Sequence, residues 1–372
     1  MKTVKVSDVV GIINKIAPSA YAESWDNPGM QVGDPAAVVE RLMVSLDACP
    51  ASIDAAIAAN CSLLLTHHPL IFKPLKRISR QDPDGDLIVR AISANLSIVS
   101  LHTNYDIAEG GVNDLLADRL GLTDTTPLLE TGSEELVKLS VFVPAGHEEP
   151  VREALFRFSS SVGNYDECSF QVAGTGTFRP LDRATPFIGE KGTRSTVAES
   201  RIEVLLSRDN LGPAMTALRK AHPYEEPAID FYQLHNRGPR RGLGRLGNLA
   251  APMTLADFSL FAKSCLSAAG VRRVGDGGRM VRRVAICGGS GASLLREAAA
   301  RGADLLLTGD LKYHEARDAQ ALGVALVDVG HFASERIMVQ GLSDRLSSEC
   351  GRLGFPVTVL QCSTEEDPFV FV

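Results

Sequence analysis

The chain has 372 residues, of which 45% are hydrophobic, and a formal net charge of -7 at pH 7. This length indicates two or three domains, and the hydrophobic content is typical of well-packed globular proteins. The negative charge and a pI near 5.7 argue against binding to nucleic acid or to an anionic membrane surface. No apolar run reaches the roughly 18 residues that a membrane-spanning helix needs, so we expect no membrane partner.

The seven cysteines are scattered along the chain and form no C-x-x-C pair. This pattern indicates neither a disulfide framework nor a zinc ribbon. Ser7 and the apolar stripe that ends at Ile16 are typical of a capped amphipathic helix, not of a signal peptide. We therefore expect a cytoplasmic protein in which nitrogen and oxygen atoms hold any metal ion.

Residues 1–128 predict the first half of an α/β core. Short apolar runs predict strands at 41–47, 62–66 and 97–101, and the segments between them predict helices at 51–60, 86–95 and 111–120. Alternating strands and helices are typical of a largely parallel sheet. Residues 23–33 predict a turn-rich loop around Trp25, with Asp26 and Asn27 as candidate substrate contacts; a loop pinned by a buried indole is the alternative.

Residues 129–238 predict an inserted α+β domain, and 239–372 predict a second α/β half. The insert has the strand and helix order of a ferredoxin-like module, with expected strands at 137–143, 169–177, 201–207 and 229–234. The glycine-rich stretch 237–244 predicts the linker that returns to the core. In the second half we expect strands at 281–287, 304–308, 324–329 and 356–361, and a helix over 332–346.

The two α/β halves look like copies of one another. The run 63–68, which ends in His67 and His68, matches 305–310, and each copy carries a histidine followed four residues later by an acid. These pairs are His102 with Asp106 and His331 with Glu335. Residues at i and i+4 of a helix share a face, and ligands gather at the carboxyl ends of parallel strands.

This pattern predicts a site for two divalent ions about 3.5–4 Å apart. The expected direct ligands are His67, His68, Asp106, His331 and Glu335. We expect Glu335 to bridge the ions and, with His102, to transfer protons in catalysis. His102 is either a sixth ligand or a group that orients the others. Zinc, manganese, iron, cobalt and nickel all suit such ligands.

Several other polar residues have weaker signals. Asp310 and His314 are expected to orient ligands or contact substrate, and His147, His222 and His235 fit the packing role that most histidines play. The turn 288–291 opens a helix after a strand and is a weak candidate for phosphate binding, together with Arg77 and Lys312.

Several motifs resemble the GTP cyclohydrolase I type 2 homologue family, also called the Nif-three-like dinuclear-metal-centre proteins. They are Trp25–Gly33, Thr66–Pro69, His102–Asp106, Thr308–His314 and Gly330–Glu335, and His222–Ala228 resembles the insert of longer members. The resemblance implies two divalent cations per chain on the five ligands named above. It also implies a toroidal homohexamer with metal sites facing an internal cavity, and a PII-like fold for the insert.

The first functional hypothesis is a metal-dependent hydrolase of a nucleotide-like small molecule. The resemblance extends this to opening the imidazole ring of GTP. The alternative is a non-enzymatic metal-binding or regulatory protein whose insert senses a small molecule or a partner.

Overall fold

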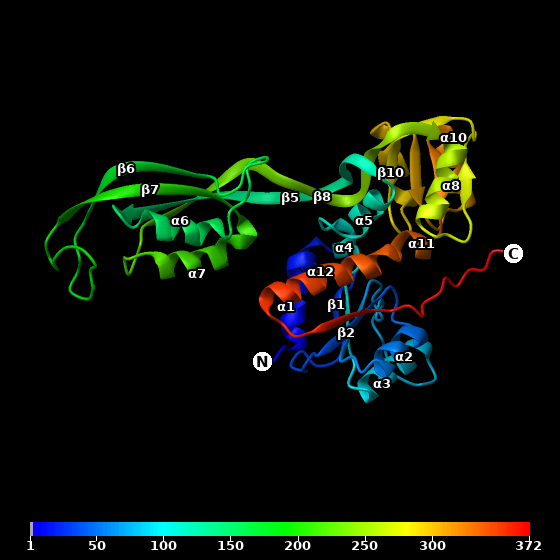
Figure 1. Cartoon of the computed structure of the whole chain (residues 1–372), viewed down its shortest axis with the longest axis horizontal. Coiled ribbons are helices and arrows are strands. Elements are labelled where there is room, and N and C mark those ends of the chain that lie inside the picture. The colour runs from blue at the N-terminus through cyan, green and yellow to red at the C-terminus, as the bar shows by residue number, and fades with distance from the viewer. Residues whose placement is uncertain (1–2) are drawn as a thin grey trace. The chain divides into compact units, whose positions relative to one another are not determined.

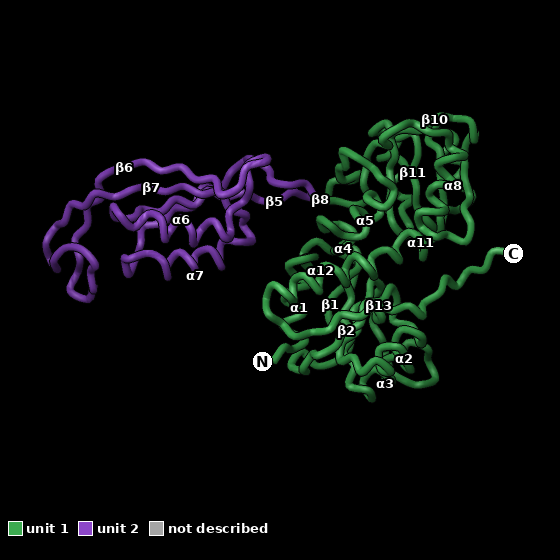
Figure 2. Tube along the Cα trace, viewed as in Figure 1, with its two compact units in different colours: residues 1–131, 241–372 green, residues 132–240 purple. Residues whose placement is uncertain are grey.

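The computed structural model describes residues 3–372 and shows two sheets with flanking helices (Figure 1). The chain forms two compact units (Figure 2). Unit 1 consists of the chain up to Thr131 together with Arg241–Val372, and unit 2 is Gly132–Arg240. The expected mixed α/β fold is confirmed.

The first sheet of unit 1 has the strand order β1-β4-β3-β2-β13. Only β1 runs antiparallel to its neighbour; the other strands are parallel. All residues of β3 are buried, which explains its continuous apolar sequence, since strands covered on both faces need no polar side. The elements are α1 (Val6–Ile16), β1 (Gly29–Val32), β2 (Arg41–Ser45), α2 (Pro50–Ala58), β3 (Leu63–Thr66), α3 (Pro83–Ser93), β4 (Ser97–Ser100), α4 (Thr103–Ile107) and α5 (Val112–Arg119).

The second sheet has eight strands, and its part in unit 1 has the order β8-β10-β11-β12-β9, with β10, β11 and β12 parallel. Its central strand β11 is fully buried, as β3 is in the first sheet. The elements are β8 (Ile229–Thr254), α8 (Leu255–Cys265), β9 (Arg272–Val274), β10 (Met280–Ile286), α9 (Leu295–Ala300), β11 (Leu305–Thr308), α10 (Tyr313–Leu322), β12 (Ala325–Asp328) and α11 (His331–Glu335).

The end of the chain returns to the first sheet. The helix expected over 332–346 is instead two helices, α11 and α12 (Ile337–Leu353). Helix α12 buries Met338 and Leu342 in the same core as Leu65 of β3, and β13 (Thr358–Gln361) pairs in parallel with β2. The residues of α11 therefore lie where the chain passes from one sheet to the other.

Residues 237–244 do return the chain to unit 1, which resumes at Arg241. The expectation of a linker is wrong in conformation, because these residues form the middle of β8. The glycines there serve close strand packing, not flexibility. A Cβ added at Gly242 would lie 1.9 Å from the carbonyl oxygen of Leu129 on the neighbouring strand, so only glycine fits the position. The short strands β1 and β9 were not expected, since neither has a clear apolar alternation.

Unit 2 consists of the outer parts of β5 (Leu122–Pro144) and β8 together with α6 (Glu148–Phe156), β6 (Ser169–Phe178), β7 (Ser195–Ser207) and α7 (Leu211–Ala221). Its strand order is β6-β7-β5-β8. The two helices contribute Leu155 and Leu218 to a core that also contains Val141 of β5 and Val204 of β7. Unit 2 therefore has its own hydrophobic core.

Arg245 of β8 is a buried cation in unit 1. Its guanidinium pairs with Asp114 of α5 and donates to three backbone carbonyls, including that of Ala108. We expect Arg245→Met to destabilise unit 1 by about 3–5 kcal/mol, because Asp114 and the carbonyls lose their donor. Urea unfolding measures this change. Arg279→Met, which breaks an exposed pair with Asp304, should cost under about 1 kcal/mol; equal effects would contradict the prediction.

Within residues 3–372, no helix has both the length and the apolar character needed to cross a bilayer.

Candidate metal centre

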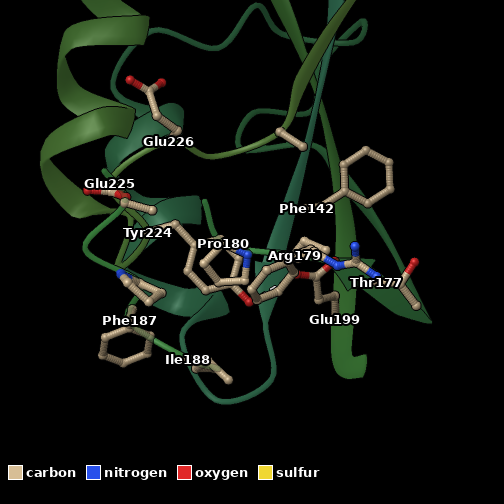
Figure 3. Close-up of a pocket in the computed structure, with 15 residues that line it drawn as sticks. Phe142, Thr177, Arg179, Pro180, Phe187, Ile188, Glu199, Tyr224, Glu225 and Glu226 are labelled. Atoms are coloured by element: carbon tan, nitrogen blue, oxygen red, sulfur yellow. Dashed lines mark hydrogen bonds between the residues drawn. The ribbon is translucent and has the colours of Figure 1, made fainter. Parts of the chain in front are cut away.

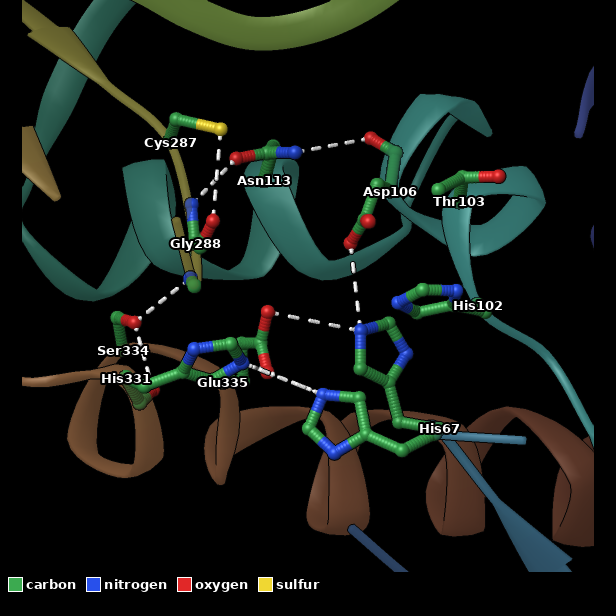
Figure 4. Close-up of polar contacts among 12 residues, drawn as sticks. His67, His102, Thr103, Asp106, Asn113, Cys287, Gly288, His331, Ser334 and Glu335 are labelled. Carbon is green, nitrogen blue, oxygen red and sulfur yellow. Dashed lines mark hydrogen bonds and ion pairs between the residues drawn. The ribbon is translucent and has the colours of Figure 1, made fainter. Parts of the chain in front are cut away.

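Imidazoles and carboxylates from three strand ends meet in unit 1 (Figure 4). His67 and His68 directly follow β3, Asp106 lies in α4 just after β4, and His331 and Glu335 form the two ends of α11 just after β12. His67 has no exposed surface, and Glu335 is 4% exposed. The geometry thus brings together the five residues that the sequence singles out as metal ligands.

The ligand atoms form two groups that share Glu335. His67, Asp106 and Glu335 form one group, and His68, His331 and Glu335 form the other, with ligand atoms within 4.8 Å of one another in each. In the first, Nε2 of His67 lies 3.5 Å from Oδ1 of Asp106 and 3.7 Å from Oε1 of Glu335. In the second, Oε2 of Glu335 lies 3.0 Å from Nε2 of His68 and 2.9 Å from Nε2 of His331. Glu335 therefore presents one oxygen to each group.

The outer nitrogen of each imidazole is held by an oxygen atom. Nδ1 of His67 lies 2.8 Å from the carbonyl oxygen of Leu101, which can only accept, so this nitrogen carries the proton. In the other three histidines Nδ1 lies 2.7 Å from a carboxylate oxygen. The pairs are His68 with Asp47, His102 with Asp26, and His331 with Asp310. In the neutral imidazoles the Nε2 lone pairs are then left for the centre, as in protein metal sites.

Some buried atoms of the centre lack a hydrogen-bond partner within residues 3–372. They are Nε2 of His67 and Oδ1 of Asp106, which lie 3.5 Å apart. Lone pairs of His68 and His331 also converge, with their Nε2 atoms 3.3 Å apart. Buried polar atoms are costly without a partner, and a cation placed between facing lone pairs would satisfy several of them at once. Imidazole nitrogens and carboxylate oxygens are suitable ligand atoms for divalent transition metals, so the residues fit a metal centre.

The pKa shifts show the same demand for positive charge. Burial opposes a charge on His68, but Asp47 and Glu335 outweigh it and raise its pKa to about 10. The hydrogen bond to Glu335 raises the pKa of His331 to about 9. Burial raises the pKa of Asp106 to about 6. Burial also opposes the charge of Glu335, yet the imidazoles hold its pKa well below its usual value.

His102 occupies a different position from His331. His102 precedes the first residue of α4, whereas His331 is the first residue of α11, so the expected match of the two His-acid pairs is off by one residue. The ring of His102 lies 5.3 Å from that of His67, and its nitrogen can join His67 and His68 in a third group of ligand atoms. His102 is therefore at the edge of the centre.

Asp26 orients His102 directly. Its carboxylate accepts hydrogen bonds from Nδ1 of His102 and from the backbone and hydroxyl of Thr103. Burial opposes the charge, but the hydrogen bonds from His102 and Thr103 lower the pKa of Asp26 to about 2. The tryptophan of this loop is exposed, not buried. Asn27 bonds the carbonyl of Ile71.

The turn at residues 288–291 does not offer its backbone to a phosphate. The N–H groups of Gly288, Gly289 and Gly291 donate to side chains of Asn113, Ser334 and Thr308 respectively. The turn instead packs on the centre, since a Cβ at Gly289 would lie 2.2 Å from Oε1 of Glu335. The weak prediction of a phosphate-binding turn is therefore wrong.

Asp310 and His314 have different surroundings. Asp310 holds Nδ1 of His331, which is an orienting contact. His314 lies in α10 with an exposed side chain beside the ring of Tyr313, and it joins none of the groups of ligand atoms found among residues 3–372.

A cavity of about 310 Å³ adjoins the centre at His331. Asp310, Arg272 and the C-terminal segment with Phe369 and Phe371 also line it. This wall could not be predicted, because a C-terminal segment without hydrophobic periodicity has no preferred position in the fold. The cavity is large enough for a small organic substrate.

We expect Asp47→Asn to weaken metal binding by about 10–100-fold, because the carboxylate that orients His68 and raises its basicity is lost. Competition with a chromophoric chelator measures the affinity. The matched control is Asp54→Asn, whose carboxylate pairs with Arg90 in an exposed position and should leave the affinity unchanged. Equal affinities for Asp47→Asn and the unsubstituted chain would contradict the orienting role.

The fold is α/β with two sheets, and its converging imidazoles and carboxylates form groups that could hold metal ions. Residues 4–368 match the family model of Duf34/NIF3 (NGG1p interacting factor 3). The chain belongs to this family, which confirms the resemblance seen in its motifs.

Curated relatives match along the whole chain. A Bacillus subtilis protein named GTP cyclohydrolase 1 type 2 homolog is 41% identical over 372 residues, covering 100% of both chains. A Mycobacterium tuberculosis protein of the same name is 39% identical, covering 99% of this chain and 97% of its own. A solved Bacillus cereus structure, described as related to NIF3, is 38% identical with a TM-score of 0.93 and complete coverage of both chains.

Proposed function

We propose that this chain binds two divalent cations and catalyses hydrolysis of a nucleotide-like substrate. The observation that carries the proposal is the set of fixed imidazoles whose Nε2 atoms converge on the two oxygens of Glu335. His67, Asp106 and Glu335 would hold one ion, and His68, His331 and Glu335 the other. A bound pair of divalent ions supplies water activation and polarisation of the electrophile.

His102 is the residue best placed to move protons. Its Nδ1 is tied to Asp26, which fixes the ring and leaves Nε2 as the proton-accepting atom. Its side chain is partly exposed, unlike that of His67, so a substrate can reach it. His102 therefore fits a general acid and base beside the ligands. Glu335, which faces three imidazoles, fits a bridging ligand better than a proton carrier.

The cavity beside His331 supports a nucleotide-like substrate. Phe369 and Phe371 offer aromatic faces on which a planar base can stack, while Asp310 and Arg272 line the same space with charge. The printed name of the curated relatives, GTP cyclohydrolase 1 type 2 homolog, supports a purine nucleotide as the class to test first.

The assembly and the insert complete the proposal. The chain order β5-α6-β6-β7-α7-β8 and the strand order of unit 2 support a ferredoxin-like, PII-like insert. The family resemblance supports a toroidal hexamer with the metal centres facing an internal cavity. Light scattering should give six times the chain mass of 39.8 kDa; a monomer would exclude the hexamer.

The function is tested by turnover of GTP and other nucleotides with protein of measured metal content. We expect ring-opened or hydrolysed product, and we expect His102→Asn to lower kcat by about 10²–10⁴-fold, the range for loss of a general acid or base. Metal content should stay unchanged in that variant. Absence of turnover by wild-type protein that holds its ions would exclude the enzyme and favour the second candidate.

The second candidate is a metal-binding regulatory protein that senses a small molecule. The observation that favours it is a cavity inside unit 2 with its own lining of aromatic and charged residues. Ligand binding to unit 2 without any turnover at the metal centre would support this candidate.

A further inference from the structure

Unit 2 contains a cavity of about 410 Å³ (Figure 3). It lies between the loop 179–188, the strap 222–228 and strands β5, β6 and β7. Most of the lining is apolar or aromatic, and its charged side chains are Arg179, Glu199, Glu225 and Glu226. Such a cavity is typical of small-molecule sites, which combine apolar walls with a few well-placed polar groups.

Three aromatic side chains form one wall of the cavity. The ring of Tyr224 lies 5.8 Å from that of Phe178 and 6.3 Å from that of Phe187. Phe187 is 51% exposed, although large apolar side chains are usually buried. Phe142 of β5 contributes a further ring to the lining (Figure 3). These faces suit a planar, apolar-faced ligand.

The strap that carries Tyr224 is held in place by His222. Nδ1 of His222 accepts from the backbone N–H of Tyr224, and its Nε2 donates to the carbonyl oxygen of Phe142. Both ring nitrogens are thus occupied within the fold, and burial lowers the pKa of His222. Glu225 ties the strap to the loop by accepting from the N–H of Thr185. The cavity is therefore preformed by fixed segments.

Glu199 places a carboxylate in this aromatic cavity. The hydroxyl of Tyr224 donates to its Oε1 at 3.0 Å, which fixes the carboxylate. The side chain lies over Gly176, where an added Cβ would stand 2.0 Å from Oε2, so the glycine makes room for the carboxylate. Within residues 3–372 the hydrogen bond of this carboxylate is made by Oε1, which leaves Oε2 to accept from a ligand. Arg179 lines the same cavity from an exposed position.

We propose that this cavity of unit 2 binds a planar nitrogen heterocycle with adjacent N–H donors, of the guanine type. The ring would stack on the exposed side of Phe187 beside Tyr224, and its N–H edge would donate to the carboxylate of Glu199. Adenine lacks such a pair of donors and would bind more weakly, because the carboxylate would face an acceptor. Arg179 would add contacts to an anionic substituent such as a phosphate.

The site is separate from the metal centre, so it stands or falls independently of the proposed function. Every lining residue belongs to unit 2, whereas the ligand groups belong to unit 1. Hydrogen-exchange mass spectrometry of the full chain distinguishes the two places, since it reports where protection appears.

The experiment adds guanosine, adenosine or guanosine 5′-monophosphate to the full chain and follows both calorimetry and hydrogen exchange. We expect saturable guanosine binding, protection of residues 176–188 and 222–228, and weaker adenosine binding. Glu199→Gln should weaken guanosine binding at least about tenfold, since a hydrogen bond to a charged group is lost and an amide donor faces the ligand. Arg179→Ala should weaken only the monophosphate.

The matched control is Glu226→Gln, whose carboxylate points away from the rings (Figure 3) and which should bind guanosine as the unsubstituted chain does. A melting curve for each variant separates loss of binding from loss of fold. Failure of guanosine to protect residues 176–188 would overturn the proposal. Equal guanosine affinity in Glu199→Gln and Glu226→Gln would overturn it as well.

Discussion

Glu335→Gln is expected to abolish stoichiometric binding of both metal ions. The substitution keeps the shape of the side chain but removes the charge that faces three imidazoles at 2.9–3.7 Å. The amide nitrogen would also present protons to lone pairs. The loss of affinity should exceed about a hundredfold, the upper range for removing a partner that merely orients a ligand. Elemental analysis after desalting measures the metal content.

The control for this variant is Glu349→Gln on the neighbouring helix α12, where the carboxylate pairs with Arg352 near the surface. That protein should retain its metal and its melting temperature. Retention of both ions by Glu335→Gln would contradict the bridging role of the Glu335 carboxylate.

Removal of the ions by a chelator is expected to destabilise unit 1 and leave unit 2 unchanged. Ions present at a hundred times their Kd stabilise the folded state by about 3 kcal/mol. For a unit of this size that corresponds to roughly 5–10 °C in Tm. The physical reason is that the metal-free centre contains buried polar atoms without hydrogen-bond partners, including Nε2 of His67 and Oδ1 of Asp106. Such atoms lower the stability of unit 1.

Calorimetry and hydrogen exchange together measure this effect. Chelation should speed exchange in α4 and α11, which carry Asp106, His331 and Glu335, and should not alter exchange in β6 and β7. Glu335→Gln serves as the control, since it should already lack both ions and show little further change on chelation. A chelator that leaves the stability of the unsubstituted chain unaltered would count against bound ions.

The sequence was most informative where local pattern and chemistry coincide. Strands β3 and β11 are four-residue apolar runs that end in polar residues, so their burial and the polar rim beyond them could be predicted. The recurrence of this pattern also pointed to two related sheets. The one-residue offset between His102 and His331 was hidden, because the start of a short helix depends on backbone geometry after the strand.

Two of the residues that orient the imidazoles could not be paired with them from the sequence alone. Asp47 lies 21 residues from His68, and Asp26 lies 76 residues from His102. A signal for Asp47 did exist: it follows the carboxyl end of β2, which pairs with β3, and polar residues at neighbouring strand ends share one rim. No comparable rule finds Asp26, since a turn-rich loop has no fixed register.

The course of the chain after α11 also escaped prediction. A single helix was expected because the apolar spacing continues past Glu335. Helix α12 instead packs its apolar face into the core of the first sheet. Strand β13 then pairs with β2. Which sheet a helix or strand joins depends on tertiary packing. The periodicity of apolar residues does not contain this information.

The most direct test is an anomalous difference map from crystals of the full chain grown with manganese or zinc. Two peaks are predicted, one beside His67 and Asp106 and the other beside His68 and His331, with a carboxylate oxygen of Glu335 against each. A map without a peak between these side chains, from protein saturated with the ion, would contradict the central claim that their lone pairs converge on cations.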